Sequence, residues 1–307
     1  MSPRIAVLLS TYNGEAFLEA QLDSLLAQTE VELEVFARDD GSSDQTLAVL
    51  ARYAGHWPQL AAPMAGPNLG PAASFMELLS GCNLAAFDYV AFCDQDDVWL
   101  PDKLSRAVSR LQAGCDDSPG LYCSGVTCVD RDLRPLGPAP VKDDTRFEHL
   151  LFENIAFGVT VVMNARAAAL VRSRPPATGM IMHDWWCALV ISAFGAVIYD
   201  ERPGVLYRQH GENQIGQATS RLGEIARLAR MFARAPGRFW PIHAQAAEFM
   251  RLFSDELKPR DRELVEALVS SKRSTGTRVA YVLTGRIGRS DLMGALAARG
   301  LILVGLY

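Results

Sequence analysis

A short apolar run that ends in three carboxylates limits the folds open to this chain. Residues 89–93 are Tyr-Val-Ala-Phe-Cys, and Asp94, Asp96 and Asp97 follow at once. An apolar run of this length predicts a strand buried on both faces, as strands of parallel sheets are. Carboxylates at the end of such a strand resist burial unless a cation neutralises them. They indicate either a solvated acidic turn or a site for a hard divalent ion.

Two earlier apolar runs are built in the same way. Residues 5–9 are followed by Ser-Thr-Tyr-Asn-Gly, and residues 33–37 by Arg-Asp-Asp-Gly-Ser-Ser-Asp. Apolar residues at helical spacing come after each run, over residues 17–26 and 47–53, and again over residues 72–81. Alternating strands and helices predict a parallel sheet with helices on its faces. Ligands bind beyond the carboxyl ends of the strands in such sheets, where all three polar clusters fall.

Later segments are expected to complete the sheet and then give way to helices. Apolar runs predict strands within residues 120–130 and at residues 158–163 and 196–199. Residues 183–194 have the spacing of a helix, and the pattern beyond residue 216 is wholly helical. We therefore expect the chain to divide near this residue.

The two parts differ in charge. Residues 1–216 carry 15 Lys and Arg against 27 Asp and Glu, whereas residues 217–307 carry 15 against 8. A basic amphipathic end is typical of helices that pack on the preceding domain, and also of helices that face an anionic lipid surface. The pattern leaves both interpretations open.

Composition predicts a cytoplasmic protein. Of the 307 residues, 49% are hydrophobic and 21% are charged, as in ordinary globular proteins. No signal-peptide architecture is recognisable, and no stretch approaches the roughly 20 apolar residues that span a bilayer. The six cysteines form neither a Cys-x-x-Cys pair nor a zinc pattern, which indicates reduced thiols. Any membrane contact is expected to be peripheral, at the inner face of the cytoplasmic membrane.

The ordered motifs resemble those of the family 2 glycosyltransferases of the GT-A fold. The resemblance covers roughly residues 3–216 and rests on STYNG, DDGSSD, NLG and DQDD followed by WLPDKL, in that order. The forms DQDDVW, MHDWW and YRQHGEN are most similar to bacterial rhamnosyltransferases of cell-surface polysaccharide assembly. The resemblance implies a Rossmann-like, mostly parallel α/β catalytic domain over residues 1–216, with a basic helical C-terminal region over residues 217–307.

The resemblance also implies a role for each matching residue. The nucleotide sugar would be held by residues that follow the strand ends: Ser10, Thr11, Tyr12, Asn13, Asp40, Asn68, Asp94 and Gln95. The ring of Tyr12 would lie against the base, and the carboxylate of Asp40 would accept the imide N–H of a pyrimidine, as the chemistry of both groups allows. The alternative for Tyr12 is a packing role.

A divalent ion, Mg²⁺ or Mn²⁺, is implied at the Asp-x-Asp signature. Asp96 would bind the ion that bridges the diphosphate, and Asp94 would lie beside it. His210 would complete the metal site, although a histidine here can equally be a hydrogen-bonded residue without a ligand. Asp97 has a weaker claim.

The general base implied by the resemblance is Asp184, which would take the proton from the acceptor hydroxyl as it attacks the anomeric carbon. His183 stands where the family usually has Glu, so the residue that orients this base is in doubt. Trp185 and Trp186 would form an apolar surface for the acceptor. As alternatives, Asp184 could cap its helix and the tryptophans could belong to the core.

These residues together indicate an inverting, metal-dependent glycosyltransferase with dTDP-rhamnose as the favoured donor. Its acceptor would be a saccharide or a polyprenyl-linked saccharide, and no nucleic acid is expected as a partner. Alternatives are a UDP-hexose donor and a non-enzymatic scaffold that binds nucleotide sugars. A nucleotidyltransferase would need a Gly-rich loop with Arg or Lys after the first strand, which STYNG does not provide.

Overall fold

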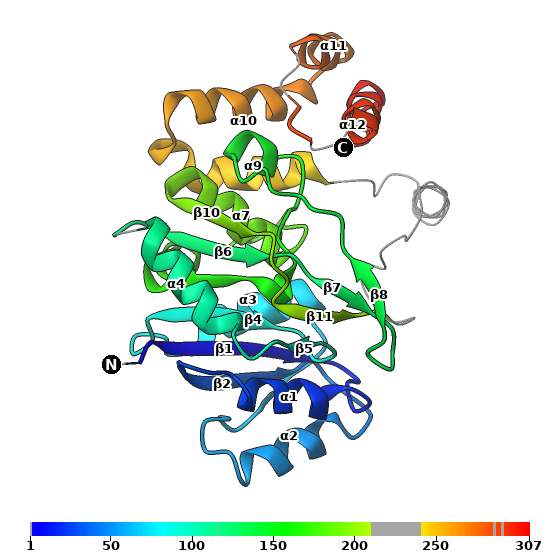
Figure 1. Cartoon of the computed structure of the whole chain (residues 1–307). Coiled ribbons are helices and arrows are strands. Elements are labelled where there is room, and N and C mark those ends of the chain that lie inside the picture. Colours follow the sequence, from blue (N-terminus) through cyan, green and yellow to red (C-terminus); the bar gives the residue numbers. More distant parts are fainter. Residues whose placement is uncertain (1, 116, 210–240, 285–286, 290–291) are drawn as a thin grey trace. The chain divides into compact units, whose positions relative to one another are not determined.

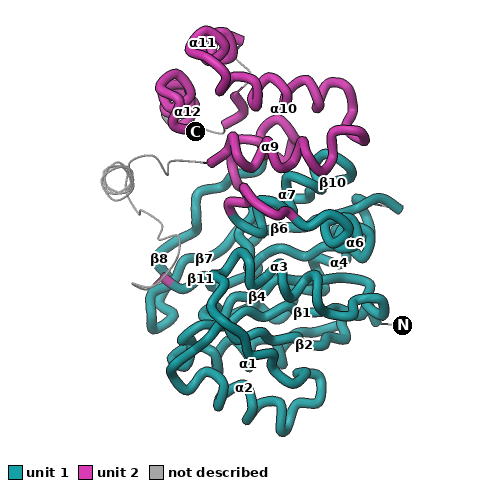
Figure 2. The backbone as a smooth tube through the Cα atoms, turned by 180° about the vertical axis from the view of Figure 1, so that it is seen from behind, with its two compact units in different colours: residues 1–143, 156–175, 182–208 teal, residues 144–155, 176–181, 209–307 magenta. Residues whose placement is uncertain are grey.

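A computed structural model describes residues 2–115, 117–209, 241–284, 287–289 and 292–307. The chain forms two compact units, which Figure 2 shows in different colours. Unit 1 comprises residues 1–143, 156–175 and 182–208, and unit 2 comprises residues 144–155, 176–181 and 209–307. The predicted boundary at residue 216 and the helical pattern up to residue 240 lie outside the described residues.

Unit 1 is built on a seven-stranded sheet with the order β10-β6-β9-β4-β1-β2-β3 (Figure 1). The strands are β1 (Arg4–Thr11), β2 (Glu32–Asp39), β3 (Met64–Ala65), β4 (Tyr89–Cys93), β6 (Gly120–Ser124), β9 (Val162–Asn164) and β10 (Ala196–Asp200). β1 pairs in parallel with both β2 and β4, whereas β9 runs antiparallel to β4 and β6. The mostly parallel sheet predicted from the sequence is confirmed.

The register of the three central strands brings their polar ends to one edge. Leu9 of β1 pairs with Ala37 of β2 on one side and with Cys93 of β4 on the other. STYNG, DDGSSD and DQDD therefore leave the sheet at the same level. This places the three polar clusters side by side, as their positions after the apolar runs predict.

Helices cover both faces of the sheet. The helices of unit 1 are α1 (Leu18–Leu26), α2 (Thr46–Ala54), α3 (Pro71–Gly81), α4 (Lys103–Cys115), α6 (Ala165–Ser173) and α7 (His183–Phe194). Side chains alternate along β1, so that Ile5, Val7 and Leu9 join one core cluster with residues of α1, α2 and α4. α3, α6 and α7 pack on the opposite face, and Figure 1 shows α1 and α4 in front.

A second sheet of unit 1, with the order β5-β11-β7-β8, extends the carboxyl edge. Its strands are β5 (Val98–Trp99), β7 (Thr127–Val129), β8 (Pro135–Pro138) and β11 (Val205–Arg208). β11 pairs antiparallel with β5, which directly follows DQDD. This pairing brings the end of β11 to the acidic loop. Residues 158–163, predicted as one strand, instead form a 3-10 turn, η1 (Gly158–Thr160), before β9.

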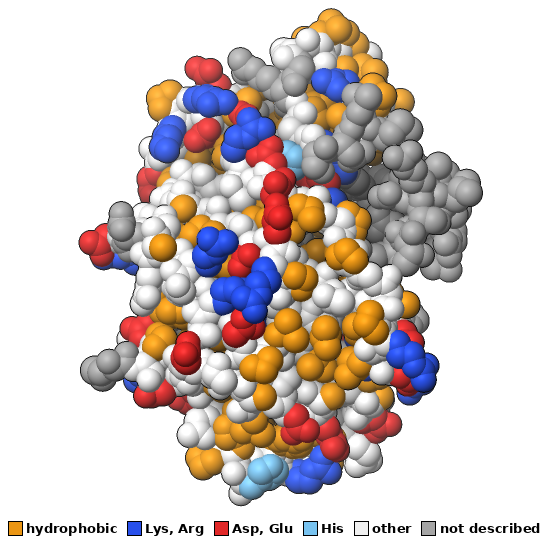
Figure 3. Space-filling view, viewed as in Figure 1, with side chains coloured by type: hydrophobic (Ala, Val, Ile, Leu, Met, Phe, Trp, Pro, Cys, Tyr) orange, Lys and Arg blue, Asp and Glu red, His pale blue; other side chains and the backbone are white. Residues whose placement is uncertain are grey.

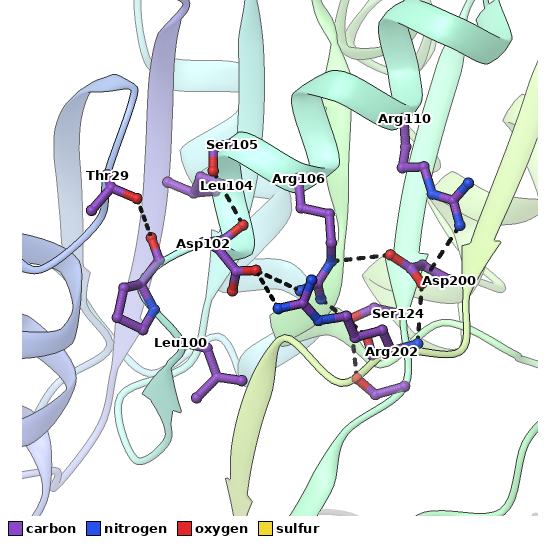
Figure 4. Close-up of polar contacts among 12 residues, drawn as sticks. Thr29, Leu100, Asp102, Leu104, Ser105, Arg106, Arg110, Ser124, Asp200 and Arg202 are labelled. Carbon is purple, nitrogen blue, oxygen red and sulfur yellow. Dashed lines mark hydrogen bonds and ion pairs between the residues drawn. The ribbon is translucent and has the colours of Figure 1, made fainter.

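An ion-pair network fixes α4, the helix after the acidic loop, to β10 (Figure 4). Arg106 of α4 donates from Nε to Asp200 Oδ2 at 3.0 Å and from Nη1 to Asp102 Oδ2 at 3.2 Å. Arg202 also pairs with Asp102 at 2.7 Å, and the hydroxyl of Tyr122 donates to Asp200 at 3.1 Å. Because Arg106 and Asp200 are largely buried, this network holds one end of the sheet rigidly.

Unit 2 is helical. It contains α5 (Phe147–Leu150), α9 (Ile242–Phe253), η2 (Ser254–Glu256), α10 (Pro259–Ser271), α11 (Thr275–Leu283) and α12 (Leu292–Val304). Glu248 of α9 accepts hydrogen bonds from Arg251 and from the backbone N–H of Ala177, which lowers its pKa to about 2. No helix among the described residues is long and apolar enough to cross a membrane. The predicted C-terminal helices are present.

Candidate active site

The acidic loop after β4 contains two kinds of carboxylate. Asp94 and Asp96 are partly exposed, whereas Asp97 is fully buried. Asp97 Oδ1 accepts the backbone N–H of Arg208 at 2.8 Å. Asp97 therefore links the loop to β11 within the protein, and Asp94 and Asp96 are the two carboxylates that can reach a ligand.

Arg208 is a functional neighbour that the sequence reasoning missed. Its Nε donates to the carbonyl oxygen of Asp96 at 2.7 Å, and its guanidinium lies 4.6 Å from the ring centre of Phe17. The side chain is buried, so a cation lies next to the backbone that carries the acidic pair. Its place at the start of YRQHGEN was the only signal in the sequence, and it gave no indication of the partner.

Asp184 comes to the acidic loop from a distant part of the chain. It is the second residue of α7, and its Oδ1 accepts the backbone N–H of Trp185 at 2.6 Å. Burial raises the pKa of Asp94 to about 8, with further contributions from the charges of Asp96 and Asp184. Asp94 therefore lies within electrostatic range of both Asp96 and Asp184, and a bound cation would offset this repulsion. The ring of His183 meets Phe92 of β4 at 4.8 Å between ring centres, so the start of α7 packs on the strand that carries the acidic loop.

His183, next to Asp184, lies in an aromatic slot. Its ring stacks on Phe75 with 4.1 Å between ring centres and meets Phe92 edge-on at 4.8 Å. Burial lowers the pKa of His183 to about 3, so the imidazole is neutral at physiological pH. Within the described part of the chain neither ring nitrogen has a hydrogen-bond partner. His183 thus fills an apolar space and supplies no charge that could orient Asp184.

Gly158 provides the space for this pair. A Cβ at residue 158 would lie 2.9 Å from Nε2 of His183 and 3.4 Å from Oδ2 of Asp184. The backbone of η1 therefore approaches the ring of His183 more closely than a Cβ would allow, and it also lies in contact range of the carboxylate of Asp184. This contact limits where the carboxylate of Asp184 can move.

Asp40 is held by the segment that carries NLG. Its carboxylate is buried and accepts hydrogen bonds from the guanidinium of Arg38 and from the backbone N–H groups of Leu69 (2.8 Å) and Gly70 (2.9 Å). Oδ1 takes two of these bonds, whereas Oδ2 takes only the one from Gly70. Because a carboxylate oxygen accepts two hydrogen bonds, Oδ2 retains the capacity to accept one from a ligand.

Other predicted nucleotide-binding residues brace the loops. Ser10 shares a hydrogen bond of 2.6 Å with Ser74, and Thr11 is buried and donates to Asp39 at 3.1 Å. Asn13, whose φ is 48°, accepts the backbone N–H of Ser43 at 2.9 Å and so joins the loops after β1 and β2. These contacts connect neighbouring strand ends.

Asn68 and Tyr12 lie at the surface of the site. Asn68 is exposed, and its side chain accepts the backbone N–H of Gly70 at 3.1 Å. Tyr12 is 49% exposed, so its ring is accessible to a ligand. The backbone of Tyr12 bonds to the side-chain amide of Gln95, at 2.7 Å from Tyr12 N to Oε1 and at 2.8 Å from Nε2 to Tyr12 O.

The remaining predicted residues differ in their surroundings. Trp185 is 8% exposed and Trp186 is fully buried in α7, so the side chain of Trp186 belongs to the core. His210 lies outside the described residues. Among the residues that the structure describes, no three His, Cys, Asp or Glu side chains form a metal site by themselves. All six cysteines are buried, and none forms a disulfide bond within the described part of the chain.

The amino-acid sequence is similar to a known protein family and to several known proteins. Residues 6–157 match the family model described as Glycosyl transferase family 2. The dTDP-rhamnosyl transferase RfbG of Shigella flexneri is 29% identical over 228 residues, which cover 72% of this chain and 78% of that protein. An uncharacterised glycosyltransferase of Nostoc is 36% identical over 109 residues, which cover 36% of this chain and 33% of that protein.

Solved structures share the fold at lower sequence identity. Residues 1–349 of S. aureus TarS, in complex with UDP-GlcNAc, match with a TM-score of 0.60 at 16% identity, over 99% of this chain and 82% of that chain. The mannosyltransferase PcManGT from Pyrobaculum calidifontis, in complex with GDP-Man and Mn²⁺, matches with a TM-score of 0.51 at 21% identity. The match covers 100% of this chain and 81% of that chain. At these identities the similarity concerns the fold alone.

Proposed function

This chain belongs to the family 2 glycosyltransferases of the GT-A fold, and we propose that it is an inverting, metal-dependent enzyme that transfers rhamnose from dTDP-rhamnose to a saccharide acceptor. The observation that carries this proposal is the packing of the start of α7 against β4, through the rings of His183 and Phe92, which brings Asp184 near the acidic loop that follows β4. A donor bound along the strand ends would place its anomeric carbon between these two groups. Asp94 and Asp96 hold the donor side, and Asp184 faces the acceptor.

The residues at the acidic loop fit a divalent cation. Asp94 and Asp96 supply hard oxygen ligands, and nearby Asp184 raises the cost of leaving these charges uncompensated. When bound, Mg²⁺ or Mn²⁺ would offset the charge that develops on the leaving diphosphate. We assign Asp96 as a metal ligand and Asp94 as its neighbour. His210, outside the described residues, remains part of the proposal as a further ligand.

Asp184 is proposed as the general base. It lies in the first turn of α7, where the partial positive charge of the helix N-terminus stabilises a negative charge. The neutral His183 beside it adds no cation that would weaken this base. We expect Asp184→Asn to lower kcat by about 10²- to 10⁴-fold, the usual size of general-base catalysis. Donor affinity should change little because the substitution keeps the volume of the side chain.

The proposed donor follows from the relative and from the base-binding residues. RfbG of Shigella flexneri is named as a dTDP-rhamnosyl transferase, and its alignment extends over most of both chains. The exposed ring of Tyr12 and the remaining acceptor capacity of Asp40 Oδ2 suit a pyrimidine, whose imide N–H needs an acceptor. A UDP-hexose offers the same imide group and is the second candidate donor.

For the acceptor we propose a lipid-linked saccharide at the inner face of the cytoplasmic membrane. Support comes from exposed apolar side chains on the last helices, which we call the C-terminal apolar surface: Val279, Leu283, Leu296, Leu303, Val304 and Leu306. Hydrophobic side chains are visible at the end of unit 2 where α11 and α12 lie (Figure 3). Lys272 and Arg273, which are exposed just before α11, suit an anionic lipid surface.

A donor screen tests the proposed activity. dTDP-rhamnose, UDP-glucose and GDP-mannose would each be incubated with the full chain and Mn²⁺, and release of the nucleoside diphosphate, with water accepting the sugar, would be followed. We expect release from dTDP-rhamnose, loss of release in Asp96→Ala and Asp184→Asn, and retained donor binding in Asp184→Asn alone. Release that is equal in wild type and Asp184→Asn would reject the base assignment.

A further inference from the structure

We propose that Gln95, the middle residue of Asp-Gln-Asp, is a positioning residue that couples the base-binding Tyr12 to the metal-binding carboxylates. This inference rests on the proposed function, because it assigns Tyr12 to the nucleotide base. It replaces the expectation that Gln95 itself contacts the nucleotide sugar. The inference rests on the two hydrogen bonds between the side-chain amide of Gln95 and the backbone of Tyr12.

Both polar atoms of the Gln95 amide are bonded to one residue. The backbone N–H of Tyr12 donates to Oε1 at 2.7 Å, and Nε2 donates to the carbonyl oxygen of Tyr12 at 2.8 Å. The side chain therefore pairs with Tyr12 as a neighbouring strand would. It extends the contact between β1 and β4 beyond their last paired residues, Leu9 and Cys93. One N–H of Nε2 and one lone pair of Oε1 are thus committed to holding the backbone of Tyr12.

Gly14 makes this contact possible. A Cβ at residue 14 would lie 2.2 Å from Oε1 and 2.5 Å from Cδ of Gln95, distances that non-bonded atoms cannot occupy. The backbone of Gly14 is also fixed on both sides. Its N–H donates to Thr46 Oγ1 at 2.7 Å, and its carbonyl oxygen accepts the N–H of Leu18 at 3.0 Å. A glycine ends STYNG because the side-chain amide of DQDD occupies the space beside it.

The consequence is that two parts of the donor are bound by one connected segment. Gln95 lies between Asp94 and Asp96, so its position follows that of the carboxylates that face the diphosphate. Through its amide the same residue sets the backbone of Tyr12, whose ring is half exposed and presented to the base. Removing the amide should therefore weaken recognition of the base more than recognition of the diphosphate.

Two substitutions separate the amide from other features of Gln95. Gln95→Leu removes both hydrogen bonds and keeps much of the volume. Gln95→Glu keeps the acceptor for the N–H of Tyr12 but places a carboxylate oxygen against the carbonyl oxygen of Tyr12, where no donor remains. Gly14→Ala disrupts the contact between Gln95 and Tyr12 without changing either residue, because the added methyl group would occupy the position of the Gln95 amide.

Gln28 offers a matched control. Its side-chain amide also joins two backbone groups, by donating to the carbonyl oxygen of Leu100 at 2.9 Å and accepting the N–H of Leu104 at 3.2 Å. These groups lie in the segment that follows the acidic loop. Gln28→Leu should lower thermal stability as a lost amide clamp does, without changing recognition of the base.

The test compares two ligands by calorimetry on the full chain with Mn²⁺: dTDP, which has a base, and inorganic pyrophosphate, which has none. We expect Gln95→Leu and Gly14→Ala each to weaken dTDP about tenfold, equivalent to about 1.4 kcal/mol, and to change pyrophosphate affinity less than twofold. Gln95→Glu should weaken dTDP as well, but its added negative charge beside Asp94 and Asp96 also weakens pyrophosphate, so the two ligands are compared on the other two variants. Gln28→Leu should change neither affinity.

Two results would overturn the inference. Unchanged dTDP affinity in all three variants would show that Gln95 does not position Tyr12, and equal loss for both ligands in Gln95→Leu and Gly14→Ala would place its effect at the metal site. Wild-type protein that binds no dTDP would instead count against the proposed function, so the two failures are distinguishable. Melting temperatures measured alongside identify a variant that has not folded.

Discussion

The guanidinium of Arg38 donates to the carboxylate of Asp40, and the two side chains are only 6% and 4% exposed. Arg38 also donates from Nη1 to Ser74 Oγ at 3.0 Å and from Nη2 to the carbonyl oxygen of Pro67 at 3.0 Å. This buried cation therefore fixes the end of β2, the start of α3 and the segment between them. The proposed base-binding carboxylate depends on it.

Removing Arg38 should cost stability and weaken nucleotide binding together. Arg38→Met leaves Asp40 as a buried charge without its cation, a change that typically lowers the free energy of unfolding by about 3 kcal/mol. Urea denaturation at neutral pH measures this loss. Arg52→Met is the matched control, because its ion pair with Glu19 is more than half exposed and should contribute little. Similar stability of the two variants would contradict the role given to Arg38.

The pH dependence of stability should carry a contribution from His183. Burial lowers its pKa to about 3, whereas an unfolded histidine titrates near 6.5. Below about pH 6, His183 therefore binds a proton in the unfolded chain but not in the folded chain. As a result the free energy of unfolding falls by about 1.4 kcal/mol per pH unit. Above about pH 7 the effect is absent because the residue is neutral in both states.

His183→Leu should remove this contribution. Denaturant unfolding at several values between pH 4 and pH 7 would then show a shallower loss of stability in the variant than in wild type. His56→Leu, which changes an exposed histidine, should retain the wild-type slope. Equal slopes in wild type and His183→Leu would mean that the imidazole becomes protonated within its aromatic slot.

Much of this fold follows from local patterns in the sequence. The apolar runs at residues 5–9, 33–37 and 89–93 predict the three central strands. Each run is too short for a helix, and in a chain where such runs alternate with helical patterns a short apolar run indicates a buried strand. The residues after each run then predict which edge binds a ligand. Asp44, the last residue of DDGSSD, accepts the backbone N–H of Thr46 at 3.0 Å, where α2 begins.

Pairings between distant segments could not be predicted in this way. Asp97, already given the weaker claim of the three carboxylates, is bonded to the N–H of Arg208, which β11 brings against it. Gln95, whose contact with the nucleotide sugar stays a prediction, pairs with Tyr12 because the parallel register of β1 and β4 brings the two residues side by side. His183 stands in a position where the family has an acid, and only its contacts with Phe75 and Phe92 explain why a neutral ring fits.

Membrane contact through the C-terminal apolar surface predicts a salt-sensitive association with anionic vesicles. Leu283 and Val304 are 80% and 64% exposed, so replacing both by Glu should abolish co-sedimentation with vesicles that contain phosphatidylglycerol. The paired control Leu26→Glu with Leu136→Glu changes apolar side chains that are 47% and 50% exposed in unit 1. Two results would exclude the C-terminal apolar surface as the membrane contact. One is wild type that does not co-sediment with anionic vesicles, and the other is a paired control that loses as much co-sedimentation as the test variant.

The central claim is that Asp96 holds a metal through which this site binds a nucleotide-sugar donor. Calorimetric titration of dTDP-rhamnose into wild type and Asp96→Ala, each with Mn²⁺ and with EDTA, tests it most directly. We predict saturable binding by wild type with Mn²⁺ and a loss of at least about tenfold in affinity in the other three samples, more than about 1.4 kcal/mol. Binding that is equally strong in all four samples, or absent from all four, would contradict the claim.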